Sequence, residues 1–309
     1  MGMKDFSLAT DGTSPKALIS PTPAILTPVS DVHPHKLVMT QLPISRIPRA
    51  MRNMGWDVSA ALMERWFASP AKEMRDDEKR DSRLVDPTHI DESIVTMAWA
   101  LGFERCGDKL KALQPRWDVD PAIDELLKRL REQGWNDKSD FALGNSALRA
   151  SDLDRSCDIN SAGVGNVRDT LDDLYGALGV ATLKMAVTGR AFVNPVTGRR
   201  VFHIHNCGFY LKDYYDFNGT QYLGLWTENE VLGKAATVVD TLLSGVSSPG
   251  MVYHWRGGGV GHVFNHNFRA YRETHHRGGD FLIYSDVLWR SMADAYVDLE
   301  SAIARASIT

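Results

Sequence analysis

The segment KDYYDFNGTQYLGLW, residues 212–226, carries two aspartates and a tyrosine in the order Asp213, Tyr215, Asp216. Carboxylates and phenols are side chains that can transfer protons in an active site. The flanking pattern is typical of a β-hairpin, and alternate side chains of a regular strand share one face. Asp213 and Tyr215 would then point one way and Asp216 the other. The two carboxylates converge only if a bulge or the onset of the turn re-aims one of them.

A second interpretation of the same segment gives it a purely structural role. Tyr215 and Phe217 would pack across the strands, and Asp216 would bond its own backbone at the turn. Asn218 and Gly219 would form the two-residue hairpin turn, since both tolerate positive φ. Spacing alone leaves the active site and the turn both open.

The order Asp213-Tyr214-Tyr215-Asp216 at a strand end is similar to the catalytic motif of the colicin M family. These bacterial toxins hydrolyse the lipid-linked peptidoglycan precursor on a β-barrel in a magnesium-dependent reaction. The resemblance implies that Asp213 and Asp216 hold Mg²⁺ or polarise water, and that Tyr215 donates to a phosphate oxygen. The family's histidine follows after a short spacer, whereas here FNGTQYLG contains none.

Histidines outside residues 212–226 could supply the general acid that the segment itself lacks. His262 or His266 could supply the missing general acid from a separate loop. His203 and His205 alternate along a strand, so they would share a face and could form two legs of a metal site. No three ligands at a fixed spacing emerge, which favours solvated surface histidines. The identity of any metal stays open.

Other motifs argue against common enzyme and nucleic-acid classes. RGGGVG, residues 256–261, lacks the Lys-Ser/Thr of a phosphate-binding loop and is predicted to be a flexible loop. The stretch NFRAYRETHHRGG, residues 267–279, is interrupted by Glu273 and predicts an amphipathic helix that ends near Gly278. With a net charge of −4, the chain gives no reason to expect a nucleic-acid partner.

A broader resemblance spans roughly residues 47–290. The segments PRAMRNMGWDVSAALMERWFASPA, HIDESIVTMAWALGF, LDDLYGALGVATLKMAVTGR, GFYLKDYYDFNGTQYLGLW and FNHNFRAYRETHHRGGDFLIYSDVLW resemble an uncharacterised bacterial domain family. Its genes occur in proteobacteria and often sit near type VI secretion components. The resemblance implies an association with that pathway and brings no catalytic residues.

Composition and the N-terminus are compatible with that association. The three cysteines, Cys106, Cys157 and Cys207, are too far apart for a metal knuckle and are predicted to be reduced thiols. Prolines interrupt the apolar stretch ALISPTPAILTPV, so no cleaved signal peptide is predicted, and no segment approaches a membrane span. We therefore expect a protein that is cytoplasmic in the producing cell and exported, if at all, by type VI secretion.

The first half of the chain predicts helices. Asp57 or Ser59 would cap one helix, a second would start near Asp91, and a third would run from Asp120 to Gly134. The charged run AKEMRDDEKRDSR, residues 71–83, predicts a solvated loop. Residues 1–48, rich in Pro, Ser and Thr, predict a disordered arm. Residues 49–150 would thus form a helical region.

The second half changes toward a period of two. LGVATLKMAVTG, RRVFHIHNCGFYLKDYYDF, TQYLGLW and FLIYSDV predict strands, with NPVTG as the turn between the first two. Met292, Tyr296, Leu299 and Ile303 keep helical spacing and predict a closing helix. The fold class predicted is α+β, with a helical N-terminal layer before a curved antiparallel sheet or small β-barrel and a C-terminal helix. Residues 151–309 would form this β-rich module.

Two functions follow from these patterns. The first is a type VI secretion-associated antibacterial effector or cargo that hydrolyses a phosphate ester of a cell-envelope precursor, with Asp213, Tyr215 and Asp216 at its centre. The alternative is a non-enzymatic adaptor or structural interaction protein of the secretion apparatus, in which the same segment only packs. Partners expected in either case are the secretion machinery or a cognate immunity or adaptor protein.

Overall fold

The structure is a computed structural model that describes residues 43–166, 169–219, 222–227, 229–232, 252–255 and 258–308. All of these residues lie in one unit of the chain, Met39–Thr309. The predicted arm, residues 1–48, lies outside the described residues except for residues 43–48.

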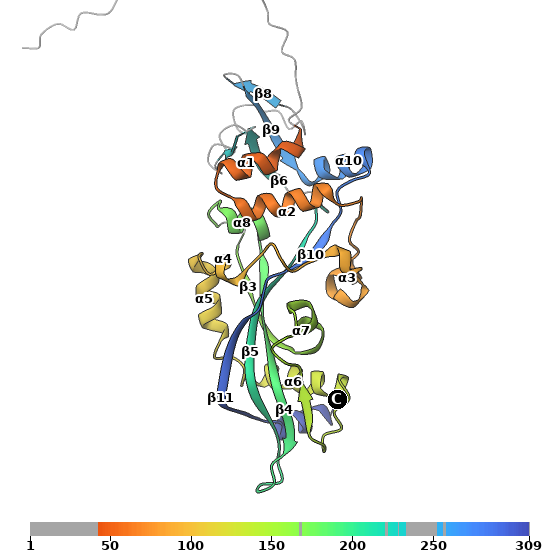
Figure 1. The fold of residues 1–309 in the computed structure, drawn as a ribbon, viewed down its shortest axis with the longest axis vertical. Coiled ribbons are helices and arrows are strands. Elements are labelled where there is room, and N and C mark those ends of the chain that lie inside the picture. Colours follow the sequence, from red (N-terminus) through yellow and green to blue (C-terminus); the bar gives the residue numbers. More distant parts are fainter. Residues whose placement is uncertain are drawn as a thin grey trace, which may run out of the picture. The chain divides into compact units, whose positions relative to one another are not determined.

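Seven strands of the described chain form a curled mixed sheet that makes a half-barrel. The strand order is β1-β10-β5-β4-β2, with β11 also paired to β5 and β3 to β4, and every pair is antiparallel except β1 with β10. Figure 1 shows β5 between β4 and β11. The bounds are β1 (Ile90–Asp91), β2 (Phe141–Leu143), β3 (Asp158–Val164), β4 (Ala181–Val193), β5 (Arg200–Tyr215), β10 (Phe281–Tyr284) and β11 (Leu288–Asp298).

The predicted turn NPVTG does join β4 to β5. The Asn194 side chain accepts hydrogen bonds from the backbone N–H groups of Val196 and Thr197, as an Asx-type turn requires. Strand β10 confirms the strand predicted in FLIYSDV. The predicted curved sheet is therefore confirmed, and it is mixed because β1 joins it in parallel.

The hairpin predicted at Asn218-Gly219 is wrong. Strand β6 (Tyr222–Thr227) does not pair with β5 but with β7 (Val231–Leu232) and β9 (Gly258–Phe264), in a second sheet completed by β8 (Val252–Trp255). The carbonyls of Phe217 and Asn218 instead accept hydrogen bonds from Arg269 and Asn265, so this connection is held by a helix. Part of the predicted RGGGVG loop is also a strand, since β9 begins at Gly258; residues 256 and 257 lie outside the described residues.

Helices precede and interrupt the strands. Their bounds are α1 (Ile47–Asn53), α2 (Asp57–Ala68), α3 (Asp76–Arg80), α4 (Met97–Ala100), α5 (Glu104–Leu113), α6 (Asp120–Glu132), α7 (Ala150–Ser156), α8 (Asp173–Leu178), α10 (Asn265–His275) and α11 (Glu300–Ala306), with 3-10 turns at Ile44–Arg46, Ser82–Leu84 and Pro87–His89. The clearest sequence prediction, α6, is confirmed, with Pro121 in its first turn. The amphipathic helix predicted before Gly278 is confirmed as α10.

Helix α2 is capped from a distance. Neither Asp57 nor Ser59 caps it, and the carboxylate of Asp173 in α8 accepts the N–H groups of Val58 and Ser59 at 3.2 and 2.9 Å. The same carboxylate accepts the Trp99 indole N–H at 3.1 Å. A buried carboxylate thus satisfies donors that a local cap would otherwise serve.

Three further element predictions need correction. The charged run at residues 71–83 is not a solvated loop, because it forms α3 and a 3-10 turn and buries Glu78 against Lys72. The helix expected near Asp91 is a short strand there, and α4 begins only at Met97. Met292 and Tyr296 lie in strand β11, so the closing helix is confined to α11. In each case tertiary partners outweigh the local pattern.

The elements pack around one hydrophobic core that includes Trp66, Phe202, Phe209 and Phe281. The α+β class predicted from the sequence is confirmed. Within the described chain, no helix combines the length and apolarity that crossing a membrane demands.

Candidate functional site

The D-x-Y-D residues lie where β5 ends. Asp213 and Tyr215 face one side of the strand, opposite Ile283 and Phe281 of β10 in register. Tyr215 is buried, and its ring packs on Phe281 with the centroids 5.4 Å apart. Tyr214 points to the other side and is 47 % exposed. Strand alternation therefore places the tyrosine of the motif in the core.

An aromatic cluster made of Trp66, Tyr215, Phe217, Phe268 and Phe281 receives this strand end. Phe217 stacks on Phe268 of α10, with ring centroids 3.7 Å apart and planes at 3°. Trp66 of α2 meets Phe217 and Phe268 edge-on at 5.0 and 5.4 Å. Such contacts stabilise the fold beyond area burial alone. These contacts show Tyr215 and Phe217 as packing residues, as the structural interpretation of the segment predicted.

Asp216 forms an ion pair with Lys79 of α3, and both side chains are mostly buried, at 15 and 16 % exposure. The Lys79 ammonium also lies 5.0 Å from the centre of the Tyr214 ring. Burial lowers the pKa of Lys79, but the hydrogen bond and charge of Asp216 raise it above its ordinary value. The second aspartate of the motif is therefore matched by a protonated lysine from the charged run that the sequence suggested was solvated.

Two other carboxyl groups nearby titrate abnormally. Burial raises the pKa of Asp213 well above its ordinary value, and the charge of Asp216 adds to this, although the N–H of Tyr214 opposes it. Burial also raises the pKa of Asp280, to about 6, even though Trp66, Arg272 and the N–H of Met74 favour its ionised form. The structure thus gathers Asp213, Asp216 and Asp280 around the aromatic cluster, and the sequence had indicated only the first two.

The two candidate histidines come from other elements. His262 lies in β9, opposite Leu225 of β6, and His266 lies in the first turn of α10, its ring stacked on Phe264 at 5.3 Å. Helix α10 also donates Asn265 and Arg269 to the carbonyls that follow Asp216. The structure therefore brings the helix of His266 to the motif's loop, but no described hydrogen bond joins His266 to either aspartate.

The other histidine pair lies on the surface side of β5. The rings of His203 and His205 meet edge to face at 4.8 Å, and His203 stacks on Tyr296 of β11 at 4.4 Å. Across the described ranges, no three His, Cys, Asp or Glu side chains are arranged to hold a metal ion. The magnesium role that the colicin M resemblance implies for Asp213 and Asp216 needs only two carboxylates and stays a prediction.

Comparison with known families gives one match over most of the chain. Residues 42–299 match the family described as "Family of unknown function (DUF6402)". The chain belongs to the DUF6402 family. Neither the curated proteins nor the solved structures gave a match. The uncharacterised family expected from the sequence is thereby confirmed, whereas family membership assigns no activity to the D-x-Y-D residues.

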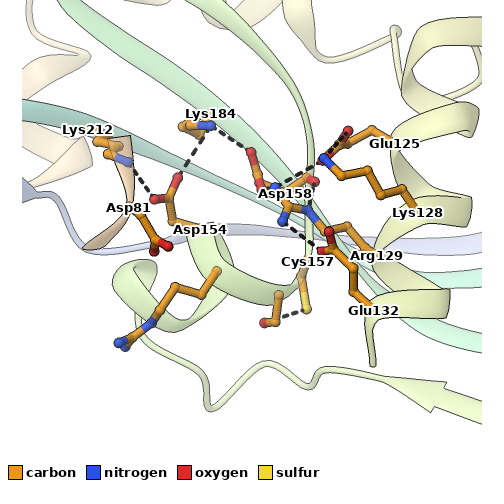
Figure 2. A network of polar contacts seen from close by, with 12 residues as sticks. Asp81, Glu125, Lys128, Arg129, Glu132, Asp154, Cys157, Asp158, Lys184 and Lys212 are labelled. Carbon is orange, nitrogen blue, oxygen red and sulfur yellow. Dashed lines mark hydrogen bonds and ion pairs between the residues drawn. The ribbon is translucent and has the colours of Figure 1, made fainter. Parts of the chain in front are cut away.

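This DUF6402 chain also buries a second polar cluster beside α7, which the sequence did not indicate. Its members, shown in Figure 2 and called here the buried charge network, are Arg129, Asp154, Asp158, Lys184 and Lys212. Asp158 accepts from Arg129 and Lys184 at 2.6 Å each, and Asp154 accepts from Lys212 at 2.7 Å. Lys184 lies 3.3 Å from the other oxygen of Asp154, which joins the two halves.

Electrostatics favour the ionised forms of Asp154 and Lys184. Burial raises the pKa of Asp154, but Lys212 and Lys184 lower it more, so the result lies below the ordinary value. Burial lowers the pKa of Lys184, but Asp158 and Asp154 raise it above normal. Tyr284 donates to Asp154 at 2.9 Å. Each charged group of the network has a partner of opposite sign, and Arg129 also pairs with Glu125 and Glu132, so the network ties α6, α7 and three strands together.

One sequence signal could have revealed the network. Lys184 stands inside the largely apolar strand segment ATLKMAV, and Lys212 directly follows the apolar run FYL. A lysine at such a position must find a carboxylate, because an unpaired buried charge is costly. The identity of the partner, in α7 or at the start of β3, could not be inferred from spacing.

Proposed function

We propose that this chain is a non-enzymatic interaction protein, an adaptor or structural component associated with a type VI secretion apparatus. The observation that carries the proposal is the packing of the D-x-Y-D segment. Tyr215 and Phe217 are buried in the aromatic cluster and Asp216 is paired with Lys79. Groups committed to the fold in this way contribute to stability. The link to type VI secretion rests on the family resemblance.

The first experiment deletes the gene from a host that carries it beside type VI secretion genes. Deletion should reduce contact-dependent killing of neighbouring bacteria, and the wild-type gene should restore it. The Asp213→Asn variant should restore it equally, because the raised pKa of Asp213 makes a neutral amide a close substitute. Unchanged killing after deletion would overturn the link to secretion.

A second candidate is the antibacterial effector that hydrolyses a phosphate ester in the envelope of the target cell. One observation favours it: a carboxyl group with raised pKa, Asp213, lies near a carboxylate paired with Lys79, Asp216. Two carboxyl groups in unlike environments are the usual basis for separate acid and base roles. On this proposal Asp213 would donate a proton and Tyr215 would contact a phosphate oxygen.

Expression in a susceptible bacterium separates the two proposals. The chain would be produced in the cytoplasm or, through an added signal peptide, in the periplasm, each beside Asp213→Asn and Asp216→Ala variants of equal solubility. An interaction protein should leave growth unchanged in both compartments. Growth arrest only from the periplasm, abolished by Asp213→Asn, would refute the interaction proposal and support the hydrolase.

A further inference from the structure

An open groove of about 330 Å³ lies between the half-barrel and the segment that leaves α5. Two strands, the end of α5 and the α5–α6 connection line it, through Lys111, Gln114, Pro115, Trp117, Cys207, Phe209, Arg290 and Met292. This volume is at the lower end of the range in which proteins hold ligands, ~300–1,000 Å³. The groove is separate from the D-x-Y-D end of β5.

The strand register explains the floor of the groove. Arg290 of β11 lies opposite Cys207 of β5, and Leu288 lies opposite Phe209, so these side chains share one face of the sheet. Cys207 and Phe209 are buried and give an apolar floor. Burial raises the pKa of Cys207 to about 12, so its thiol stays neutral and contributes only apolar surface.

The rim of the groove carries positive charge. Arg290 is exposed and, among the described residues, has no carboxylate partner. Lys111 on the opposite wall is 80 % exposed, and its contact with Asp108, at 3.2 Å, is an exposed pair of the kind that contributes little. An occupant that places an apolar group on the floor would therefore be favoured if it also carried negative charge.

Strand β11 adds a backbone element to the same rim. It pairs with β5 along one side, and no described strand pairs with its other side. An edge strand presents N–H and C=O groups that an added strand can pair with. In β-strand addition, main-chain hydrogen bonds provide affinity, and pockets for alternate side chains provide specificity. Arg290 and Met292 project from this edge strand into the groove.

We propose that this groove binds an extended peptide segment of a partner protein in which acidic residues alternate with large apolar ones. The segment adds to the edge of β11, places an apolar side chain between Trp117 and Met292, and places a carboxylate beside Arg290. The inference rests on the proposed function, since it names the surface through which an interaction protein would contact its partner.

The test uses the full chain and a fluorescein-labelled peptide of alternating glutamate and leucine, with binding followed by fluorescence anisotropy. Binding should weaken as salt is added, because exposed charges are screened. Arg290→Glu should weaken it on the order of tenfold or more. The matched control is Arg49→Glu, which makes the same charge change at an exposed arginine of α1 and should leave affinity unchanged. Met292→Lys, on the edge strand β11, gives a second variant and should also weaken binding of the peptide.

Several results would overturn the proposal. The proposal fails if the glutamate–leucine peptide does not bind, or if a matched lysine–leucine peptide binds equally well. It also fails if Arg290→Glu and Arg49→Glu change the affinity for the peptide equally. A fourth result combines two measurements: decanoate displaces the peptide, yet Met292→Lys leaves peptide affinity unchanged. The peptide would then bind outside the groove, and the proposal would be refuted. The outcome is independent of the gene-deletion experiment. Selective peptide binding with unchanged killing refutes only the secretion link, whereas lost killing with no peptide binding refutes only the groove.

Discussion

Removing the negative charge of Asp154 should destabilise the fold strongly. Its carboxylate accepts from Lys212 at 2.7 Å and from Tyr284 at 2.9 Å, and it lies 3.3 Å from Lys184. Asp154→Asn keeps the shape but leaves two largely buried ammonium groups with only Asp158 as counter-charge. Removing one member of a buried ion pair costs about 3–5 kcal/mol, because the remaining charge is desolvated without compensation. We expect a loss of that size.

Equilibrium unfolding in urea measures this loss. Tryptophan fluorescence and circular dichroism should give coincident transitions if unfolding is two-state. The matched control is Asp140→Asn, which breaks a pair with Arg190 of similar length, 2.6 Å, whose side chains are 58 and 56 % exposed. An exposed pair contributes less than about 1 kcal/mol. Equal losses for the two variants would refute the description of the network as buried and fully matched.

The pH dependence gives the same prediction a second readout. The pKa of Asp154 in the folded chain lies below its ordinary value, so its contribution is present above the unfolded pKa, about 3.9. It is lost as the pH falls through the folded pKa. The difference in stability between wild type and Asp154→Asn should therefore be constant near neutral pH and shrink below about pH 4. A difference that grows in acid would contradict the assigned sign.

Three further perturbations test other parts of the fold. Asp280 has a folded pKa of about 6 against about 3.9 unfolded, so its contribution is present below pH 4 and lost as the pH rises through 6. Urea unfolding of wild type should accordingly lose roughly 3 kcal/mol relative to Asp280→Asn between pH 4 and 7. Gly278→Ala should lower the melting temperature more than Gly219→Ala. Both glycines have positive φ, but only at Gly278 would an added Cβ clash with the Trp66 ring. Equal shifts in melting temperature would contradict that packing. Asp173→Ala should lower the free energy of unfolding in urea by at least about 2 kcal/mol, because the buried N–H of Ser59 and the indole N–H of Trp99 lose their acceptor. A loss under about 0.5 kcal/mol would refute the distant cap.

The sequence was informative about elements whose signals are local. Helix α6 has its proline in the first turn and a regular apolar stripe, and both survive in the structure. The turn between β4 and β5 depends on Asn194 bonding its own backbone, which a short motif specifies. Elements determined by distant partners were missed. Strand β11 has helical spacing but pairs with β5, and the Asn218-Gly219 turn loses to contacts from α10.

In the candidate site too, local features could be predicted from the sequence, whereas contacts from distant elements could not. Alternation along β5 correctly placed Asp213 and Tyr215 on one face, because the side-chain period is a property of the strand itself. Lys79, Arg272 and Asp280 could not be assigned to the site, because they approach it from α3, α10 and the residue before β10. Charged residues that look solvated in sequence become partners only after the chain has folded.

The structure bears differently on the two sequence resemblances, to the colicin M motif and to the uncharacterised family. The colicin M motif spans four residues, and its meaning depends on a site that faces a substrate. Here Asp216 is paired with Lys79 and Tyr215 stacks on Phe281, so these two groups take part in charge pairing and packing. The family match covers residues 42–299 and is independent of that motif. A groove with an apolar floor, a positive rim and an unpaired strand edge then becomes the more informative surface, because those features can bind a partner without any catalytic group.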